Sequence, residues 1–159
     1  MIVKTSYRDH GASALAEYIG RDDHQVRDRD GRELSDRELK RFIDQSDHHG
    51  FEREFIVSPE AGDDMPPGEL EQRTRQTMRE FEDGRPSTRW VYAVHDDTDH
   101  EHVHVAATGR RRDLYMDRED IEYFRERGTE LFREPERERG QEREQEHERE
   151  RERDGGRSR

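Results

Sequence analysis

Four of the nine histidines in this 159-residue chain lie close together, between His95 and His104. Imidazole is a common metal ligand near neutral pH, and three imidazoles that converge on one point form a site for a divalent ion. An apolar run at 90–94 precedes these histidines, residues 103–107 continue the apolar pattern, and 96–101 is polar. The β-branched and aromatic residues therefore predict a β-hairpin with its loop at 96–101.

The spacing of the histidines predicts that three of them meet. His102 and His104 are two residues apart, so they project from the same face of a strand, about 7 Å from each other. Val103 and Val105 then occupy the other face. His95 ends the partner strand and can lean across toward the other two. We therefore predict that His95, His102 and His104 bind a divalent metal ion.

Two alternatives stay open for this segment. A histidine-rich tract can be a solvated loop that binds metal loosely, although such a loop does not require the alternation of histidine with valine. His100 lies in the predicted loop, and its spacing from His102 leaves open whether it is a further ligand.

Composition divides the chain into two parts. Only 26% of residues are hydrophobic and 45% are charged. The segment 133–159 holds nine arginines, nine glutamates and one aspartate, and its only apolar residue is Pro135. It cannot bury a core, so we expect a disordered or transiently helical tail with a charge of −1. Residues 1–132 then form one domain that carries −11 of the net charge of −12.

Several classes of protein are disfavoured by what the sequence lacks. The chain has no cysteine, which excludes a disulfide framework and a thiolate metal site. No apolar run approaches the roughly 20 residues of a membrane span. The N-terminus has no apolar core of a secretory signal. We expect a soluble cytoplasmic protein with no membrane partner.

The charged residues are unevenly chosen. Lys4 and Lys40 are the only lysines among 30 basic residues, against 42 acidic ones. An acidic surface with little lysine is typical of proteins exposed to molar salt, where self-repulsion is screened. A halophilic source is therefore one hypothesis, and a high-GC genome is an alternative reason for the preference for arginine.

The remaining segments predict how the hairpin is held. Ser35 and Glu38 match a helix capping box. Further strands are predicted over 1–7 and 51–58, and helices over 11–19, 35–45, 69–81 and 117–132. Strands and helices interleave, with a hairpin near the end. The pattern predicts an α+β fold, in which flanking helices cover a mainly antiparallel sheet.

A metal ion beside a phosphodiester would polarise a phosphoryl oxygen and offset charge in the transition state. Such a site also needs a nucleophile, and the chain has no cysteine. A tyrosine phenolate can attack phosphorus and form a covalent intermediate. The five tyrosines are Tyr7, Tyr18, Tyr92, Tyr115 and Tyr123. Spacing alone does not choose among them.

Three segments, in this order, resemble the motifs of mobilisation-type relaxases: 11–21, 55–60 and 95–104. These enzymes belong to the HUH endonuclease superfamily, named for its His-hydrophobic-His motif. The resemblance covers roughly residues 1–132 and implies an HUH or relaxase-like fold. It implies that Tyr18 attacks the scissile DNA phosphate and becomes linked to the 5′ end. It also implies that the three histidines hold Mg²⁺ or Mn²⁺.

The resemblance assigns further roles. Asp97 matches the acidic position of the third motif and would orient a histidine. Ser58 matches the serine of the second motif, which would contact DNA near the nick. Arg110 and Arg111 follow the histidine strand in sequence, and from their charge we expect them to contact DNA phosphates. One departure is Glu101, where the family often has proline immediately before the histidine pair.

Two functions from different classes are therefore considered. The first is a metal-dependent, site-specific single-strand DNA endonuclease and strand transferase that serves plasmid mobilisation or conjugative transfer. Its partners would be single-stranded DNA at an origin of transfer and accessory mobilisation proteins. The second is a catalytically degenerate relaxase-like protein that binds DNA or a partner. The intact tyrosine and the three histidines favour the first, and the acidic body keeps the second open. A hydrolase that uses activated water is less favoured, because no general base is evident beside the histidines.

Overall fold

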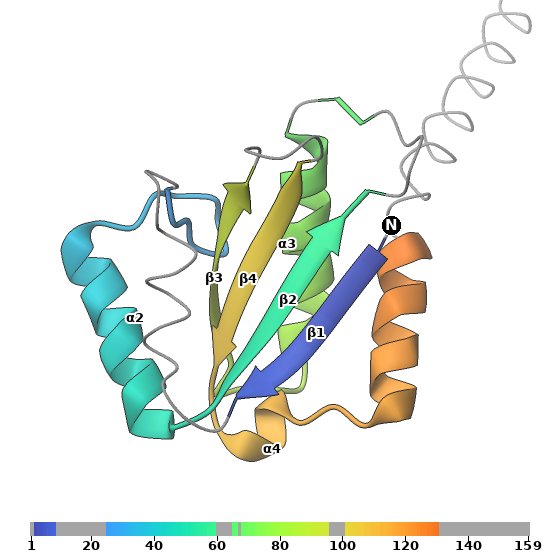
Figure 1. Cartoon of the computed structure of the whole chain (residues 1–159). Helices are drawn as coiled ribbons and strands as arrows, with labels where there is room; N and C mark the ends of the chain where they lie inside the picture. Colours follow the sequence, from blue (N-terminus) through green and yellow to red (C-terminus); the bar gives the residue numbers. More distant parts are fainter. Residues whose placement is uncertain (1, 9–24, 60–64, 67, 96–100, 131–159) are drawn as a thin grey trace, which may run out of the picture.

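A four-stranded antiparallel sheet forms the centre of the protein in the computed structural model (Figure 1). Its strands are β1 (Ile2–Arg8), β2 (Glu52–Ser58), β3 (Arg89–His95) and β4 (His102–Thr108). They lie in the order β1-β2-β4-β3, and all three neighbouring pairs are antiparallel. The strands predicted over 1–7 and 51–58 and the pairing of the two predicted hairpin strands are confirmed.

The structure describes residues 2–8, 25–59, 65–66, 68–95 and 101–130. The predicted helix over 11–19 and the tail from residue 133 lie outside these residues. Residues 96–100 of the predicted hairpin loop also lie outside the described residues, and residue 101 is described.

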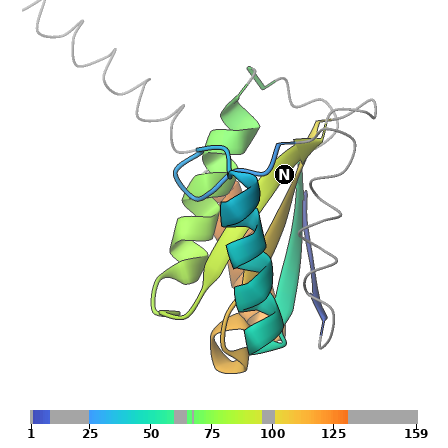
Figure 2. The ribbon, with the colours of Figure 1, turned by 90° about the vertical axis from the view of Figure 1, so that its left-hand side faces the viewer.

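Helices cover both faces of the sheet, as the α+β prediction requires (Figures 1 and 2). They are α2 (Asp36–His49), α3 (Glu69–Glu82), the short α4 (Arg111–Leu114), and a helix over 118–130. The helix α3 and the helix over 118–130 pack on one face, which we call the α3 face. The helix α2 packs on the other, the α2 face, beside β3 and β4.

The α3 face carries the larger hydrophobic core. Phe55 on β2 is fully buried, and its ring lies 5.0 Å from the rings of both Phe81 on α3 and Phe124 on the last described helix. Leu70, Thr74, Thr77, Met78 and Phe81 form the buried side of α3, as their helical spacing predicts. Val103 and Val105 are buried in the same core. The valines that alternate with the histidines therefore anchor β4 to this face.

The α2 face carries a smaller core beneath α2. Phe42 packs there with Val91, Ala93 and Ala106 of the sheet, and Leu39 and Ile43 are partly buried beside it. The segment before α2 extends the sheet edge, since Arg27 exchanges backbone hydrogen bonds of 2.8 and 2.9 Å with Tyr92 of β3. This smaller core occupies only part of the α2 face.

The capping box at the start of α2 is confirmed, but the predicted end of the helix is wrong. The Ser35 hydroxyl accepts a hydrogen bond from the Glu38 backbone N–H, and the Glu38 side chain accepts one from the Ser35 backbone. The helix continues one turn past residue 45, to His49. It ends where Gly50 takes a left-handed φ of 72° and its N–H bonds to the Ser46 carbonyl. Because Ser46 is polar, its burial against the sheet was not evident from the apolar pattern.

The short helix α4 was not predicted, and the predicted helix over 117–132 is described over 118–130. Among the described residues, no helix has the length and apolar character needed to cross a membrane.

The packing of the helix over 118–130 can be tested through Phe124. Truncating this buried ring in Phe124→Ala removes its contacts with Phe55 and Phe81. We expect the free energy of unfolding, measured by urea denaturation, to fall by about 3–5 kcal/mol. Tyr123→Ala is the matched control, because that neighbouring side chain is 67% exposed, and it should change stability by less than about 0.5 kcal/mol. Equal losses in the two variants would contradict the packing.

Candidate metal centre

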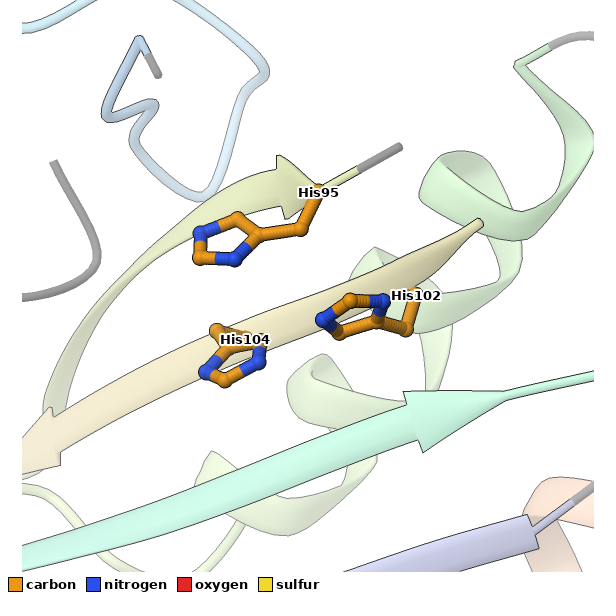
Figure 3. A group of neighbouring side chains, drawn as sticks. All are labelled: His95, His102 and His104. Atoms are coloured by element: carbon orange, nitrogen blue, oxygen red, sulfur yellow. The ribbon is translucent and has the colours of Figure 1, made fainter. Parts of the chain in front are cut away.

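The pairing of β3 with β4 brings the three predicted ligands together (Figure 3). His95 pairs directly with His102, and Ala93 pairs with His104. The ring of His95 lies 5.2 Å from that of His102 and 4.3 Å from that of His104. The rings of His102 and His104 are 4.8 Å apart. One histidine from β3 and two from β4 therefore converge on the α2 face of the sheet.

This donor set fits a divalent metal ion. One ligand nitrogen from each histidine can be chosen so that the three lie within 4.8 Å of one another. Bonds of about 2.1 Å from each nitrogen to an ion would bring any two nitrogens to within about 4.2 Å. Small side-chain rotations satisfy that limit. His95 and His104 are only 8% and 7% exposed, so the strands already hold two of the rings in place.

Glu54 on β2 adds a carboxylate that the sequence prediction missed. Its Oε1 lies 3.6 Å from Nδ1 of His104, and its Oε2 accepts a hydrogen bond of 3.4 Å from the Ser6 hydroxyl on β1. The Glu54 side chain is 13% exposed. A carboxylate on the second nitrogen of a metal-binding imidazole orients the ring and raises its basicity. Glu54 is therefore well positioned to orient His104.

Two of the described tyrosines lie on the α3 face, away from the histidines. Tyr92 is fully buried in the larger core, and its hydroxyl donates a 2.6 Å hydrogen bond to Glu71. Burial, followed by the bond to Glu71, raises the pKa of Tyr92 far above its ordinary value, which opposes formation of a phenolate. Tyr7 pairs in register with Arg53 and stacks on Phe51, 5.9 Å away. Neither hydroxyl faces the histidines.

The other two described tyrosines are also remote from the site. Tyr115 follows α4, which lies at the opposite end of the sheet from the histidines (Figure 1). Tyr123 is exposed on the helix that covers the α3 face. Tyr18 lies outside the described residues, so its position relative to the histidines stays a prediction.

Ser58 shares both the face and the end of the sheet with the histidines. Ile56 pairs with His104, and Val57 with Val103, so Ser58 lies at the end of β2 next to the start of β4. Side chains alternate along a strand, which puts Ser58 on the same face as Ile56 and His104. Asp97 lies outside the described residues, and its role as an orienting acid stays a prediction.

Arg110 and Arg111 lie at the other end of β4. From His102 to Thr108 the strand rises about 20 Å, and both arginines follow Thr108. Arg110 is exposed and lies near His49 at the end of α2. Burial, followed by the charges of His48 and Arg110, lowers the pKa of His49. The guanidinium of Arg111 lies 5.5 Å from the centre of the Phe51 ring. DNA bound at the histidines would have to extend along the sheet to reach either arginine.

Comparison with known families agrees with this geometry. A family model described as "Relaxase: MobA/VirD2-like, nuclease domain" matches residues 33–140, which is more than half of the chain. The match includes the three histidines, Glu54 and Ser58. It does not include β1 or residue 18. No curated protein matches the chain.

The role of Glu54 can be tested by metal binding. Glu54→Gln removes the negative charge beside Nδ1 of His104 and keeps the shape of the side chain. We expect the affinity for Mn²⁺, measured by isothermal titration calorimetry, to fall about 10- to 100-fold. Glu119→Gln, an exposed substitution of the same kind on the helix over 118–130, should leave the affinity unchanged. Wild-type affinity in Glu54→Gln would show that this carboxylate does not support the ligand.

Proposed function

Because the chain belongs to the relaxases with a MobA/VirD2-like nuclease domain, we propose that it nicks single-stranded DNA at an origin of transfer in plasmid mobilisation or conjugative transfer. The observation that carries the proposal is the convergence of His95, His102 and His104 on one face of the sheet. This arrangement can hold the metal ion that such a reaction uses, and it lies inside the matched region.

The three histidines would hold Mg²⁺ or Mn²⁺. Bound there, a divalent ion would polarise the scissile phosphate and offset the charge that develops in the transition state. Of the two ions, Mn²⁺ suits an all-nitrogen donor set better, because Mg²⁺ favours oxygen ligands and gives up water reluctantly. The chain contributes the two histidines of β4, the facing ring on β3, and Glu54 to orient His104.

Tyr18 is the proposed nucleophile. Its phenolate oxygen attacks the scissile phosphorus, and the bond from phosphorus to the 3′ oxygen breaks. The phenol has given up its proton, and the departing 3′ oxygen takes one up. The products are a free 3′ hydroxyl and a 5′ phosphate linked to Tyr18. The 3′ hydroxyl of a later strand can attack that phosphorus, which rejoins the DNA and releases the tyrosine. The remoteness of the four described tyrosines from the histidines supports this choice, together with the resemblance of residues 11–21 to the first relaxase motif.

The remaining contacts position the DNA and the ligands. Ser58, beside the histidines on β2, is proposed to bind the strand near the nick. Asp97 is proposed to orient a histidine, as Glu54 does for His104. Arg110 and Arg111, beyond the far end of β4, are proposed to bind DNA phosphates that lie farther from the nick. Accessory mobilisation proteins are proposed to help open the duplex at the origin.

The acidic charge of the chain weakens its attraction for DNA. A net charge of −12 repels a polyanion, and salt weakens each contact between a phosphate and a basic side chain. Contacts that depend less on salt, such as base stacking and metal binding, would then carry more of the affinity. This condition makes the salt concentration part of any activity test.

The test is the formation of a covalent adduct between protein and DNA. Labelled single-stranded oligonucleotides from the origin-like region of the protein's own replicon are incubated with the protein and Mn²⁺, at low and at molar KCl. We expect an adduct that survives denaturation, that requires the metal, and that is lost in Tyr18→Phe. Tyr115→Phe, which removes an exposed hydroxyl at the far end of the sheet, should form the adduct at the wild-type rate.

Other outcomes separate the alternatives. Cleavage that persists in Tyr18→Phe without an adduct would indicate a nuclease that uses water as its nucleophile. Binding without cleavage, at both salt concentrations and on oligonucleotides that span the whole origin, would indicate a degenerate relaxase that only binds DNA. Either result would overturn the proposed reaction.

A further inference from the structure

Lys4 on β1 lies in the same row of the sheet as His104. Lys4 pairs with Ile56 of β2, and Ile56 pairs with His104 of β4. Two strand spacings of about 4.8 Å separate Lys4 from His104, so the backbones of these two residues are about 10 Å apart. The row crosses the strands at the end of the sheet where the histidines lie.

The side chain of Lys4 is on the α2 face, with the histidines. Its neighbours in sequence, Val3 and Thr5, pair with Val57 and Phe55, which belong to the core of the α3 face. Ser6, two residues on, contacts Glu54, and Glu54 contacts His104. Since side chains alternate along a strand, Lys4 is on the same side as Ser6. Lys4 is exposed, and it forms no hydrogen bond or ion pair among the residues that the structure describes.

We propose that Lys4 binds a phosphate of the DNA strand next to the phosphate held at the histidines. The strand would then cross the sheet from β4 toward β1. This inference rests on the proposed function, and it adds the path of the DNA and a residue that positions it.

Charge supports this path. Glu54 contacts His104 and Ser6, and in the described part of the chain it forms no ion pair with Lys4. Arg89, the basic residue of β3, is on the same face, but it lies at the opposite end of that strand from His95, about 20 Å away. A lysine carries its charge on a long stem, which lets the ammonium reach a neighbouring phosphate. In an acidic protein, such a cation lowers the repulsion where the DNA must approach the metal.

The path across the sheet differs from a path along β4. Lys4 is about 10 Å from His104 in backbone position, whereas Arg110 lies beyond the end of a strand that rises about 20 Å from the histidines. A strand that leaves the histidines toward β1 passes Ser58 on β2 and then reaches Lys4 on β1. A strand that follows β4 meets the core beneath α2 before it meets Arg110.

The first experiment measures the salt dependence of DNA binding. The full chain with Mn²⁺ is titrated against a fluorescein-labelled single strand of mixed sequence at several KCl concentrations. Loss of one phosphate contact on a single strand should lower the slope of log affinity against log salt by about 0.7. We expect that change in Lys4→Gln and the wild-type slope in Lys4→Arg. Lys40→Gln, which removes the only other lysine, from the exposed side of α2, should keep the wild-type slope.

The results distinguish this inference from the proposed function. No binding by the wild-type protein, to this strand or to oligonucleotides that span its origin, would overturn the proposed function, and this inference with it. Binding by the wild type with the same slope in Lys4→Gln would overturn this inference alone.

A second experiment maps the path directly. The chain has no cysteine, so Lys4→Cys introduces a single thiol that can carry an aryl azide crosslinker. We expect strong photocrosslinking to the labelled strand from position 4 and only background from Lys40→Cys. Strong crosslinking from Arg110→Cys with background from Lys4→Cys would mean that the DNA follows β4, and would overturn the proposed path.

Discussion

The antiparallel register between β3 and β4 is the constraint on which the rest of the site depends. It pairs His95 with His102 directly and brings His104 beside Ala93. Because side chains alternate along a strand, a slip of one residue would turn the β4 histidines toward the α3 face and expose Val103 and Val105. The hydrophobic core opposes that slip, since both valines are fully buried. The packing energy of the core therefore also fixes the geometry of the ligands.

The two faces of the sheet carry different kinds of residues. The α3 face holds the aromatic cluster around Phe55 and buries Tyr92, whose raised pKa makes it unsuitable as a nucleophile. The α2 face holds a smaller core on one side and the histidines with Glu54, Ser6 and Lys4 on the other. A chain with only 26% hydrophobic residues cannot cover both faces with an apolar core. Part of one face stays polar, and the three histidines lie in that part.

Local patterns predicted most of the fold and the convergence of the three histidines. The alternation around His102 and His104, the capping box at Ser35 and the helical spacing in α3 each involve residues close in sequence, and each is confirmed. What depended on distant pairing was not predicted. Glu54 meets His104 only because β2 pairs with β4, 50 residues away in the chain. The strand also carries Glu52 and Arg53, so its sequence alone did not single out Glu54.

Sequence proximity was also a poor guide to distance for the arginines. Arg110 and Arg111 follow the histidine strand closely in sequence, but an extended strand carries them about 20 Å from His102. The end of α2 was missed for a different reason. A buried serine and two terminal histidines continue the helix without adding to its apolar pattern.

The position of His95 and His102 at the ends of their strands has a thermodynamic consequence. They are the last residue of β3 and the first of β4, so an ion bound to both would join the two strands where the loop begins and ends. Such an ion would stabilise the folded state, in which the hairpin is closed and the ligands are together. Stability would then rise with the free concentration of the ion, because the ion binds the folded chain and not the unfolded one. The metal ion would then stabilise the fold as well as serve the proposed reaction. The concentration of free metal would affect both the stability and the activity of the protein.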